Sequence, residues 1–410
     1  MTERAAASPE EAMAALLSPD GRRDPYPRYE ALRAHGDLVT VRPGLMAAVG
    51  HAVCARALRE PWLQVQDAES YDRDLPGWRS HSSLRGWTGS MLYTNPPDHT
   101  RLRRLVSGAF TFRRVTALGP AIERMTGRLL DRVAELGAGG APVDFMREFA
   151  FRLPVGVIGA LLGVPEDDQG WFRAAAADVT LALEGTTDPS VLGTADKAMD
   201  ELSAYFTTLI AHRRREPADD LVSDLVRVHD TDGSRLGEHE LTANLVLLLS
   251  AGFDTTTHLL GHGLKLALEH PDAAARLAAE PGFAEGYVEE CLRFEPPVQA
   301  TTRWAVTDAD LLGTRVPAGT KVVVMLAAGN RDPRRFDRPD VFDPGRPDNQ
   351  PLSFGGGAHF CLGAALARLE ARIALPMLLR RFPAVTAAGP ADYRDRWLVR
   401  GHDTFPVTVG

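Results

Sequence analysis

Residues 353–363 read SFGGGAHFCLG, with three consecutive glycines and a histidine just before a cysteine. Cys361 is one of only three cysteines in 410 residues. Three kinds of site could place so many glycines beside one thiol: a phosphate-binding loop, half of a metal site, or a platform for a single exposed thiolate. The rest of the chain decides among them.

The first two kinds of site lack the residues that they need. A phosphate loop requires a lysine after the glycines or a third glycine in Gly-x-Gly-x-x-Gly, but no lysine follows and Phe360 occupies the third position. A zinc site requires about four ligands, of which His359 and Cys361 supply two, with no second pair at suitable spacing.

The third kind fits the residues that follow. The segment 362–382 is rich in alanine and leucine and predicts a helix directly after Cys361. Unpaired N–H groups and the positive dipole end at a helix start favour thiolate over thiol. The glycines allow the backbone to approach a flat partner without Cβ clashes. A cysteine-ligated haem iron requires this combination.

Composition limits the partners and the compartment. Apolar residues make up 44% of the chain and charged residues 24%, the range of globular proteins. The net charge of −8 disfavours nucleic acid as a partner. The other two cysteines, Cys54 and Cys291, lie far from Cys361, which argues against a disulfide framework and indicates a reducing compartment.

Neither the N-terminus nor the apolar runs predict export or a membrane span. The first 20 residues are acidic and lack a secretory signal, and we expect them to be flexible. The central apolar run 245–249 is far too short to cross a bilayer. We therefore expect a cytoplasmic protein with no membrane partner, built as one domain over residues 1–410.

Hydrophobic periodicity predicts a mainly α fold with small β-sheets (α+β). Residues 38–50 predict a hairpin around a Pro-Gly pair, and 63–93 read as a long irregular loop. From about residue 96 most segments have apolar residues at helical spacing. A second β region is expected at 303–326.

The stretch 239–270 predicts the longest helix, ended by Pro271 and apolar around most of its circumference. Its middle, AGFDTTT (251–257), contains a glycine and three threonines, which are poor helix formers. Such a face could be a groove for a ligand or only a kink packed with small residues, and this segment alone leaves both open.

Two sets of charged residues stand out. Glu290 and Arg293 lie one helical turn apart between apolar flanks, so we expect a pair that is partly buried. His99 and Arg103 are i, i+4 neighbours that would project together toward an anionic group, although a solvated helix face is the simpler reading.

These segments together resemble the cytochrome P-450 superfamily of haem-thiolate monooxygenases. FGGGAHFCLG resembles the haem-binding signature, and the likeness spans nearly the whole chain in the expected order. The other matching segments are HTRLRRLV (99–106), AGFDTT (251–256), Glu290–Arg293, RWAVTD (303–308) and FDPGRP (342–347).

The resemblance implies a single large domain with haem b (iron protoporphyrin IX) buried between the long central helix and the cysteine loop. Cys361 would be the axial ligand of the iron, and Asp254 and Thr255 would be catalytic and deliver protons. The implied haem contacts are His99, Arg103, Ala251, Gly252, Thr255, Arg303, Phe354, Gly355, His359 and Gly363. Glu290, Arg293 and Arg346 would form a structural network on the cysteine side.

The implied function is insertion of one oxygen atom of O2, by hydroxylation or epoxidation, into a bulky hydrophobic natural-product intermediate. Electrons would come from NAD(P)H through a ferredoxin reductase and a ferredoxin, as in the bacterial branch. A non-catalytic haem-binding helper subunit and a peroxide-driven enzyme are the alternatives. Intact Cys361, Asp254 and Thr255 disfavour both.

The implied substrate contacts are Trp78, Trp87, Met91, Leu92, Val179, Leu183, Leu247, Val298 and Val399. Loop tryptophans often only anchor their loop, so Trp78 and Trp87 have two readings. Arg101 and Arg104 are expected to dock an acidic ferredoxin. One departure from the family pattern is Pro351, which stands where many bacterial relatives have a histidine, so one propionate contact would be missing or supplied from elsewhere.

Overall fold

A computed structural model describes residues 7–231 and 236–410. By its internal contacts the chain divides into two compact units, each assembled from distant segments. The sheet unit comprises Met1–Val65, Glu285–Cys361 and Asp392–Asp403, and the helical unit comprises Gln66–Ala284, Leu362–Ala391 and Thr404–Gly410. The chain passes repeatedly between the two units. The expectation of a single domain over 1–410 stays a prediction. The mainly α class with small sheets is confirmed.

The sheet unit is built on a five-stranded sheet of order β1-β2-β8-β5-β3. Its strands are β1 (Leu38–Arg42), β2 (Leu45–Ala48), β3 (Leu63–Gln64), β5 (Thr301–Ala305) and β8 (Lys321–Val324). Strand β8 pairs parallel with β2 and antiparallel with β5, so the predicted hairpin β1–β2 is extended by a segment some 275 residues downstream.

Shorter elements complete this unit. Its helices are α1 (Pro9–Leu17), α2 (Pro19–Arg23), α3 (Tyr26–Arg33), α4 (His51–Ala57), α16 (Phe283–Phe294) and α17 (Leu326–Gly329). Two further strand pairs are β6 (Ala309–Leu311) with β7 (Thr314–Val316) and β10 (Asp392–Tyr393) with β11 (His402–Thr404).

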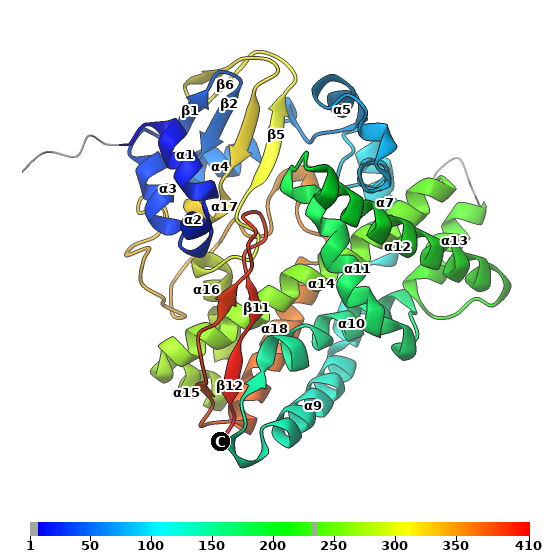
Figure 1. Ribbon diagram of the computed structural model, residues 1–410, viewed down its shortest axis with the longest axis vertical. Helices are drawn as coiled ribbons and strands as arrows, with labels where there is room; N and C mark the ends of the chain where they lie inside the picture. The colour runs from blue at the N-terminus through cyan, green and yellow to red at the C-terminus, as the bar shows by residue number, and fades with distance from the viewer. Residues whose placement is uncertain (1–6, 232–235) are drawn as a thin grey trace, which may run out of the picture. The chain divides into compact units, whose positions relative to one another are not determined.

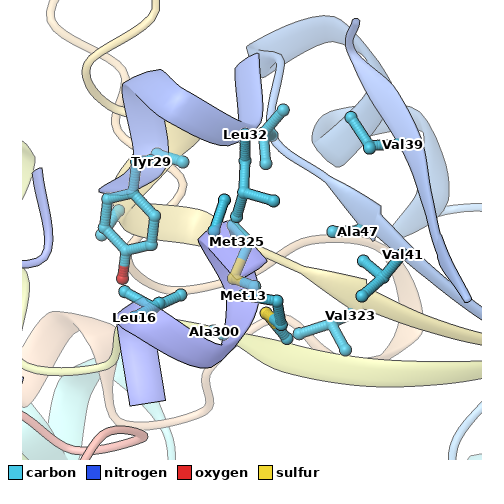
Figure 2. Packing of buried hydrophobic residues seen from close by; sticks show 14 residues of the cluster. Met13, Leu16, Tyr29, Leu32, Val39, Val41, Ala47, Ala300, Val323 and Met325 are labelled. Atoms are coloured by element: carbon cyan, nitrogen blue, oxygen red, sulfur yellow. The ribbon is translucent and has the colours of Figure 1, made fainter. Parts of the chain in front are cut away.

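Helix α1 overturns part of the expected flexible N-terminus. Residues 1–6 lie outside the described chain, but Met13 and Leu16 of α1 are buried against Tyr29 of α3 and Val323 of β8 (Figure 2). Ser8 caps α1, because its hydroxyl accepts from the Glu11 amide and the Glu11 carboxylate accepts from the Ser8 amide. A capped helix with a buried face is part of the core.

The helical unit is drawn mostly in cyan and green in Figure 1. Its helices are α5 (Ala68–Asp74), α6 (Ser82–Thr88), α7 (Asp98–Ala109), α8 (Phe112–Ala117), α9 (Gly119–Leu136), α10 (Arg152–Leu162), α11 (Gln169–Val179), α12 (Pro189–Arg215), α13 (Leu221–Thr231), α14 (Glu238–Glu269), α15 (Pro271–Ala279) and α18 (Ala364–Arg381). A small sheet of order β4-β12-β9 joins Val143–Asp144, Pro406–Thr408 and Thr386–Ala387.

The stretch 63–93 is not the irregular loop that the sequence predicts. It contains β3, α5, a 3-10 turn at Trp78–Ser80 and α6. Helix α5 starts at a cap, where Asp67 accepts from the Ser70 amide at 2.9 Å. The helices are seven residues long, too short for a clear hydrophobic period, so contacts with the rest of the unit stabilise them.

Helix α14 matches its prediction within one residue at each end. Glu240 Oε2 accepts a hydrogen bond from the Gly237 amide at 2.7 Å at its start, and Pro271 begins α15 directly after it. Helix α14 packs against α10, α12 and α18 (Figure 1). At Gly263 a Cβ atom would lie 2.6 Å from Leu375 Cδ1 of α18, so the glycine permits the close approach of these two helices.

No helix of the described chain has both the length and the hydropathy required to traverse a bilayer.

A buried ion pair in α16 holds the irregular segment that follows α17 in the sheet unit. Arg293 donates to both carboxylate oxygens of Glu290 at 2.7 and 2.8 Å, and both side chains have 0% exposure. Arg293 also donates to the carbonyls of Asn330, Pro339 and Val341. Each buried charge is thus paired and its remaining donors are used, which a buried ion pair needs to avoid a net cost.

The same carboxylate organises the segment after residue 340. Glu290 accepts from the Asp343 amide at 2.8 Å and from Asn349 Nδ2 at 2.9 Å. Arg346 lies 3.4 Å from Glu290 Oε1 and donates to the Val341 carbonyl at 3.0 Å. A chain segment with little regular structure is therefore fixed by one side chain.

We predict that Glu290→Gln lowers the free energy of unfolding by about 3–5 kcal/mol, because it leaves Arg293 buried without a counter-charge. The matched control is Glu280→Gln, since Arg276 also donates to both oxygens of Glu280, but both side chains are half exposed. The control should change stability by at most about 0.5–1 kcal/mol. The free energy of unfolding is measured by urea unfolding. Equal decreases in the two variants would show that burial does not increase the contribution of the Glu290–Arg293 pair to stability.

Candidate active site

The loop around Cys361 has a backbone that only glycine tolerates at two points. Gly355 and Gly357 have φ angles of +70° and +64°. A Cβ atom on Gly357 would lie 2.4 Å from the Leu58 carbonyl oxygen. The amide of Cys361 donates to the Phe354 carbonyl at 2.9 Å, which closes the loop. The glycines thus allow a tight turn against α4 and bring Cys361 to a fixed place.

Cys361 differs from the other two cysteines in its exposure. It is partly exposed and forms no disulfide, whereas Cys54 and Cys291 are buried. Burial raises the pKa of both of those thiols, which keeps them protonated and inert. Cys361 lies three residues before the first residue of α18, at the end that carries the positive dipole. It is the cysteine that is placed to act as a thiolate ligand.

Asn330 connects this loop to the buried ion pair, and sequence reasoning missed it. Its side-chain oxygen accepts from the Leu352 amide at 2.7 Å, and its amide nitrogen donates to Ser353 Oγ at 2.9 Å. Its backbone carbonyl accepts from Arg293. The signal in the sequence is an asparagine at the end of the apolar run VVVMLAAGN (322–330).

Arg303 is a buried cation on strand β5. It is 4% exposed, and its Nη1 donates to Thr301 Oγ1 at 3.2 Å and to the Thr302 carbonyl at 2.8 Å. Within the described residues no carboxylate pairs with it, and burial lowers its pKa to about 10. A guanidinium held out of water without a counter-charge is costly, so the site fits an added anion such as a carboxylate.

The remaining predicted residues of the cysteine loop lie as follows. Phe354 is partly buried, and its ring centroid is 6.5 Å from that of Phe360. His359 ends the 3-10 turn that starts at Gly357 and is partly exposed. Gly363 directly precedes α18. Pro351, the departure from the family pattern, is partly buried at the start of the loop.

Helix α14 has one opening in its middle. Every residue from Leu241 to Leu264 is buried except Ala251, Gly252 and Thr255. Ala251 is exposed, and Thr255, one turn later on the same face, is partly exposed and donates to the Ala251 carbonyl at 2.9 Å. An exposed alanine at the centre of a buried helix marks a face that no side chain of this unit covers.

Gly252 does not only leave room for a ligand, as the sequence suggests. A Cβ atom there would lie 3.1 Å from Ile158 Cδ1 of α10. The glycine therefore serves the packing of α10 against α14. The open face of α14 is carried by Ala251 and Thr255.

Asp254 is buried beside a histidine that sequence reasoning missed. His258 Nε2 lies 3.4 Å from Asp254 Oδ1, and the two side chains are 1% and 4% exposed. The i, i+4 spacing on one helix is the signal that could have identified the pair.

Helix α7 carries the other predicted cationic contacts. His99 is 2% exposed and Arg103 is partly buried. Arg101 pairs with Glu240 at 2.6 Å and with Asp98 at 3.1 Å, which ties α7 to the start of α14, and its docking role stays a prediction. Arg104 is exposed.

The two tryptophans among the predicted substrate contacts are hydrogen-bonded to neighbouring parts of their own unit, and their contact with a substrate stays a prediction. Trp78 is 4% exposed and donates to Asp72 Oδ1 at 2.8 Å. Trp87 is 2% exposed and donates to the carbonyl of Val179 at 3.2 Å, which fastens α6 to the end of α11. Both indoles are held by the protein itself.

The other predicted substrate contacts fall into both units. In the helical unit, Leu92 is exposed and Leu183 is partly buried, whereas Met91, Val179 and Leu247 are buried. In the sheet unit, Val298 and Val399 face each other in an isolated β-bridge and are partly buried.

Comparisons with known proteins agree with this geometry. The family model described as Cytochrome P-450 matches residues 188–391. The chain is 40% identical to the cytochrome P-450 monooxygenase PikC of Streptomyces venezuelae, over 95% of this chain and 92% of PikC. It is also 40% identical to the vitamin D(3) 25-hydroxylase of Pseudonocardia autotrophica, over 95% and 94% of the two chains.

A solved structure agrees as well. P450BioI, in complex with an acyl carrier protein ligated to hexadec-9Z-enoic acid, matches with a TM-score of 0.88 and 34% identity, covering 95% of this chain and all of that one. Identity at this level over nearly the full length shows common descent and not only a shared fold. The chain belongs to the cytochrome P-450 family.

Proposed function

We propose that this protein is a haem b-dependent monooxygenase that inserts one oxygen atom of O2 into a bulky hydrophobic small molecule. The observation that carries the proposal is the placement of Cys361, a partly exposed thiol on a glycine-shaped loop at the N-terminal end of α18. Helix start and exposure both favour the thiolate, which is the form that ligates iron.

The residues present fit the rest of a haem group. Arg303 is a buried cation without a carboxylate partner in the described chain, and a haem propionate supplies that charge. His99, Arg103 and His359 would bind the propionates with it, which compensates for Pro351. Gly355 and Gly363 would allow close approach of the backbone, and Phe354 would shield the Cys361 sulfur from water.

Bound haem supplies the activation of O2 and the oxidation itself. The chain's share is to hold the cofactor, to place the substrate and to provide protons. Ala251 and Thr255 leave the middle of α14 open, and Asp254 lies next to them in the helix. We assign Thr255 and Asp254 to proton delivery, with the Thr255 hydroxyl held by the Ala251 carbonyl.

The substrate class is proposed from the apolar contacts and from the relatives. Two relatives are named for vitamin D(3) and for a carrier-bound hexadecenoic acid, both large and mostly apolar. A natural-product intermediate of similar size suits the apolar set Trp78, Trp87, Met91, Leu92, Val179, Leu183, Leu247, Val298 and Val399. The reaction would be hydroxylation or epoxidation.

The electron route is proposed to run from NAD(P)H through a ferredoxin reductase and a ferredoxin. Arg104 is exposed on α7 and Arg101 is partly exposed, and both are candidates for docking an acidic ferredoxin. The three cysteines form no disulfide, which suits a cytoplasmic location. A peroxide-driven enzyme and a non-catalytic helper remain the alternatives, and the retained Asp254, Thr255 and Cys361 favour the monooxygenase.

The first prediction concerns the iron ligand. Cys361→Ala should abolish the thiolate-type absorption band of the reduced carbon-monoxide adduct, because no other thiol is exposed enough to replace it. The matched control is Cys54→Ala, which removes a buried thiol and should leave the band in place. A band that survives in Cys361→Ala would refute the ligand assignment.

The second prediction concerns the buried cation. Arg303→Met should speed the loss of haem to apomyoglobin about 10- to 100-fold, because one charged hydrogen bond contributes about 1.5–3 kcal/mol. Arg315→Met on β7 is the control, since Arg315 is 78% exposed and pairs with Asp308. Equal rates of haem loss in wild type and Arg303→Met would remove Arg303 from the haem site.

The lowered pKa of Arg303 also predicts how the stability of the haem-free protein depends on pH. Burial lowers the folded-state pKa to about 10, below its unfolded value, so the uncompensated charge is a cost at neutral pH. Without haem, stability should therefore rise as the pH increases through 10, and this rise should be absent in Arg303→Met. With haem bound, the propionate should suppress the rise.

A further inference from the structure

The buried pair of Asp254 and His258 has no place in the proposed function so far. The two side chains lie one turn apart on α14, with Nε2 and Oδ1 separated by 3.4 Å. Both are at most 4% exposed, so the pair is held in the interior of the helical unit. At this distance a carboxylate and a protonated imidazole form an ion pair, and each of the two groups can gain or lose one proton.

The surroundings of His258 are aromatic. The ring of Phe151 meets the imidazole edge-on, with centroids 6.2 Å apart at 80°, and it also lies 6.0 Å from the ring of Phe253. The guanidinium of Arg173 lies over Phe151, 4.0 Å from its centroid. A low-dielectric setting of this kind strengthens the interaction between the carboxyl and the imidazole.

The pair lies beside the open turn of α14. Thr255 follows Asp254 directly and bonds to the carbonyl of Ala251, the exposed residue of the turn. The carboxyl that His258 contacts is therefore on the residue directly before Thr255 of the open face. His258 is a titratable group within ion-pair distance of Asp254, on the next turn of the same helix.

We propose that His258 is a positioning residue for Asp254, which fixes the carboxyl and stabilises its charge after it has passed a proton on. This inference rests on the proposed role of Asp254 in proton delivery. At rest Asp254 is a carboxylate paired with His258, and it takes up a proton from solvent water before delivery. When that O–H bond breaks, a water molecule at the open turn accepts the proton and the carboxylate is restored. An N–H at Nε2 of His258 stabilises that carboxylate until a proton from solvent water restores the acid.

Three variants test the role of His258, two at position 258 and one control at position 262. His258→Phe removes the ring N–H and keeps the packing against Phe151. His258→Gln retains an N–H donor at a similar reach. His262→Phe is the matched control, because His262 is a buried histidine one turn further along α14. All are purified with haem and checked by the carbon-monoxide band.

His258→Phe should lower the product formed per NADPH consumed about tenfold, the equivalent of one charged hydrogen bond. His258→Gln should restore at least half of the loss, and His262→Phe should match wild type. Unchanged coupling in His258→Phe, while Asp254→Asn uncouples the enzyme, would overturn the role of His258 alone. Unchanged coupling in Asp254→Asn would instead overturn the proposed proton delivery.

A second measurement does not depend on turnover. In the diamagnetic reduced carbon-monoxide form, NMR of labelled histidines, assigned through the loss of a signal in His258→Gln, gives the pKa of His258. A neighbouring carboxylate raises an imidazole pKa, so Asp254→Asn should lower it. The same pKa in wild type and Asp254→Asn would show that the two side chains do not share charge, and would overturn the proposal.

Discussion

The position of Cys361 depends on the bidentate ion pair between Arg293 and Glu290. Both groups are fully shielded from water, so neither can lose the other without leaving an uncompensated charge. Arg293 also holds the Asn330 carbonyl, and the Asn330 side chain holds Leu352 and Ser353. From there the glycine turn leads to Cys361 within eight residues. The loop that carries Cys361 is thereby held rigidly, as the proposed role of Cys361 as a metal ligand requires.

The opposite requirement holds in the middle of α14. This helix is buried over about six turns, yet Ala251 in its middle is exposed. The Thr255 hydroxyl donates its hydrogen bond to a backbone carbonyl of the same helix. Both choices lower stability, because apolar burial is lost and threonine is a poor helix former. Functional sites commonly retain such locally unfavourable choices, and dense packing against α10 and α18 compensates for this one. The buried Asp254–His258 pair begins on the same turn.

Much of the fold, and the family, could be predicted from sequence because the signals were local. The hairpin, the bounds of α14 and the cysteine loop each depend on residues close together in the chain. The short helices α5 and α6 could not be predicted, because seven residues give too little periodicity and contacts elsewhere stabilise them. The pairing of Arg101 with Glu240 could not be predicted, because the two residues are 139 positions apart in the chain. Asn330 makes its contacts through tertiary structure, which no motif marks, whereas the i, i+4 spacing of Asp254 and His258 was a local signal that was overlooked.

The central claim is that the sulfur of Cys361 is the ligand of the haem iron. X-ray absorption at the iron edge of the purified protein tests it most directly, because the scattering of a bound sulfur differs from that of nitrogen or oxygen. The account predicts one sulfur neighbour of the iron in wild type and none in Cys361→His. An iron without a sulfur neighbour in wild type, or one that keeps it in Cys361→His, would contradict the account.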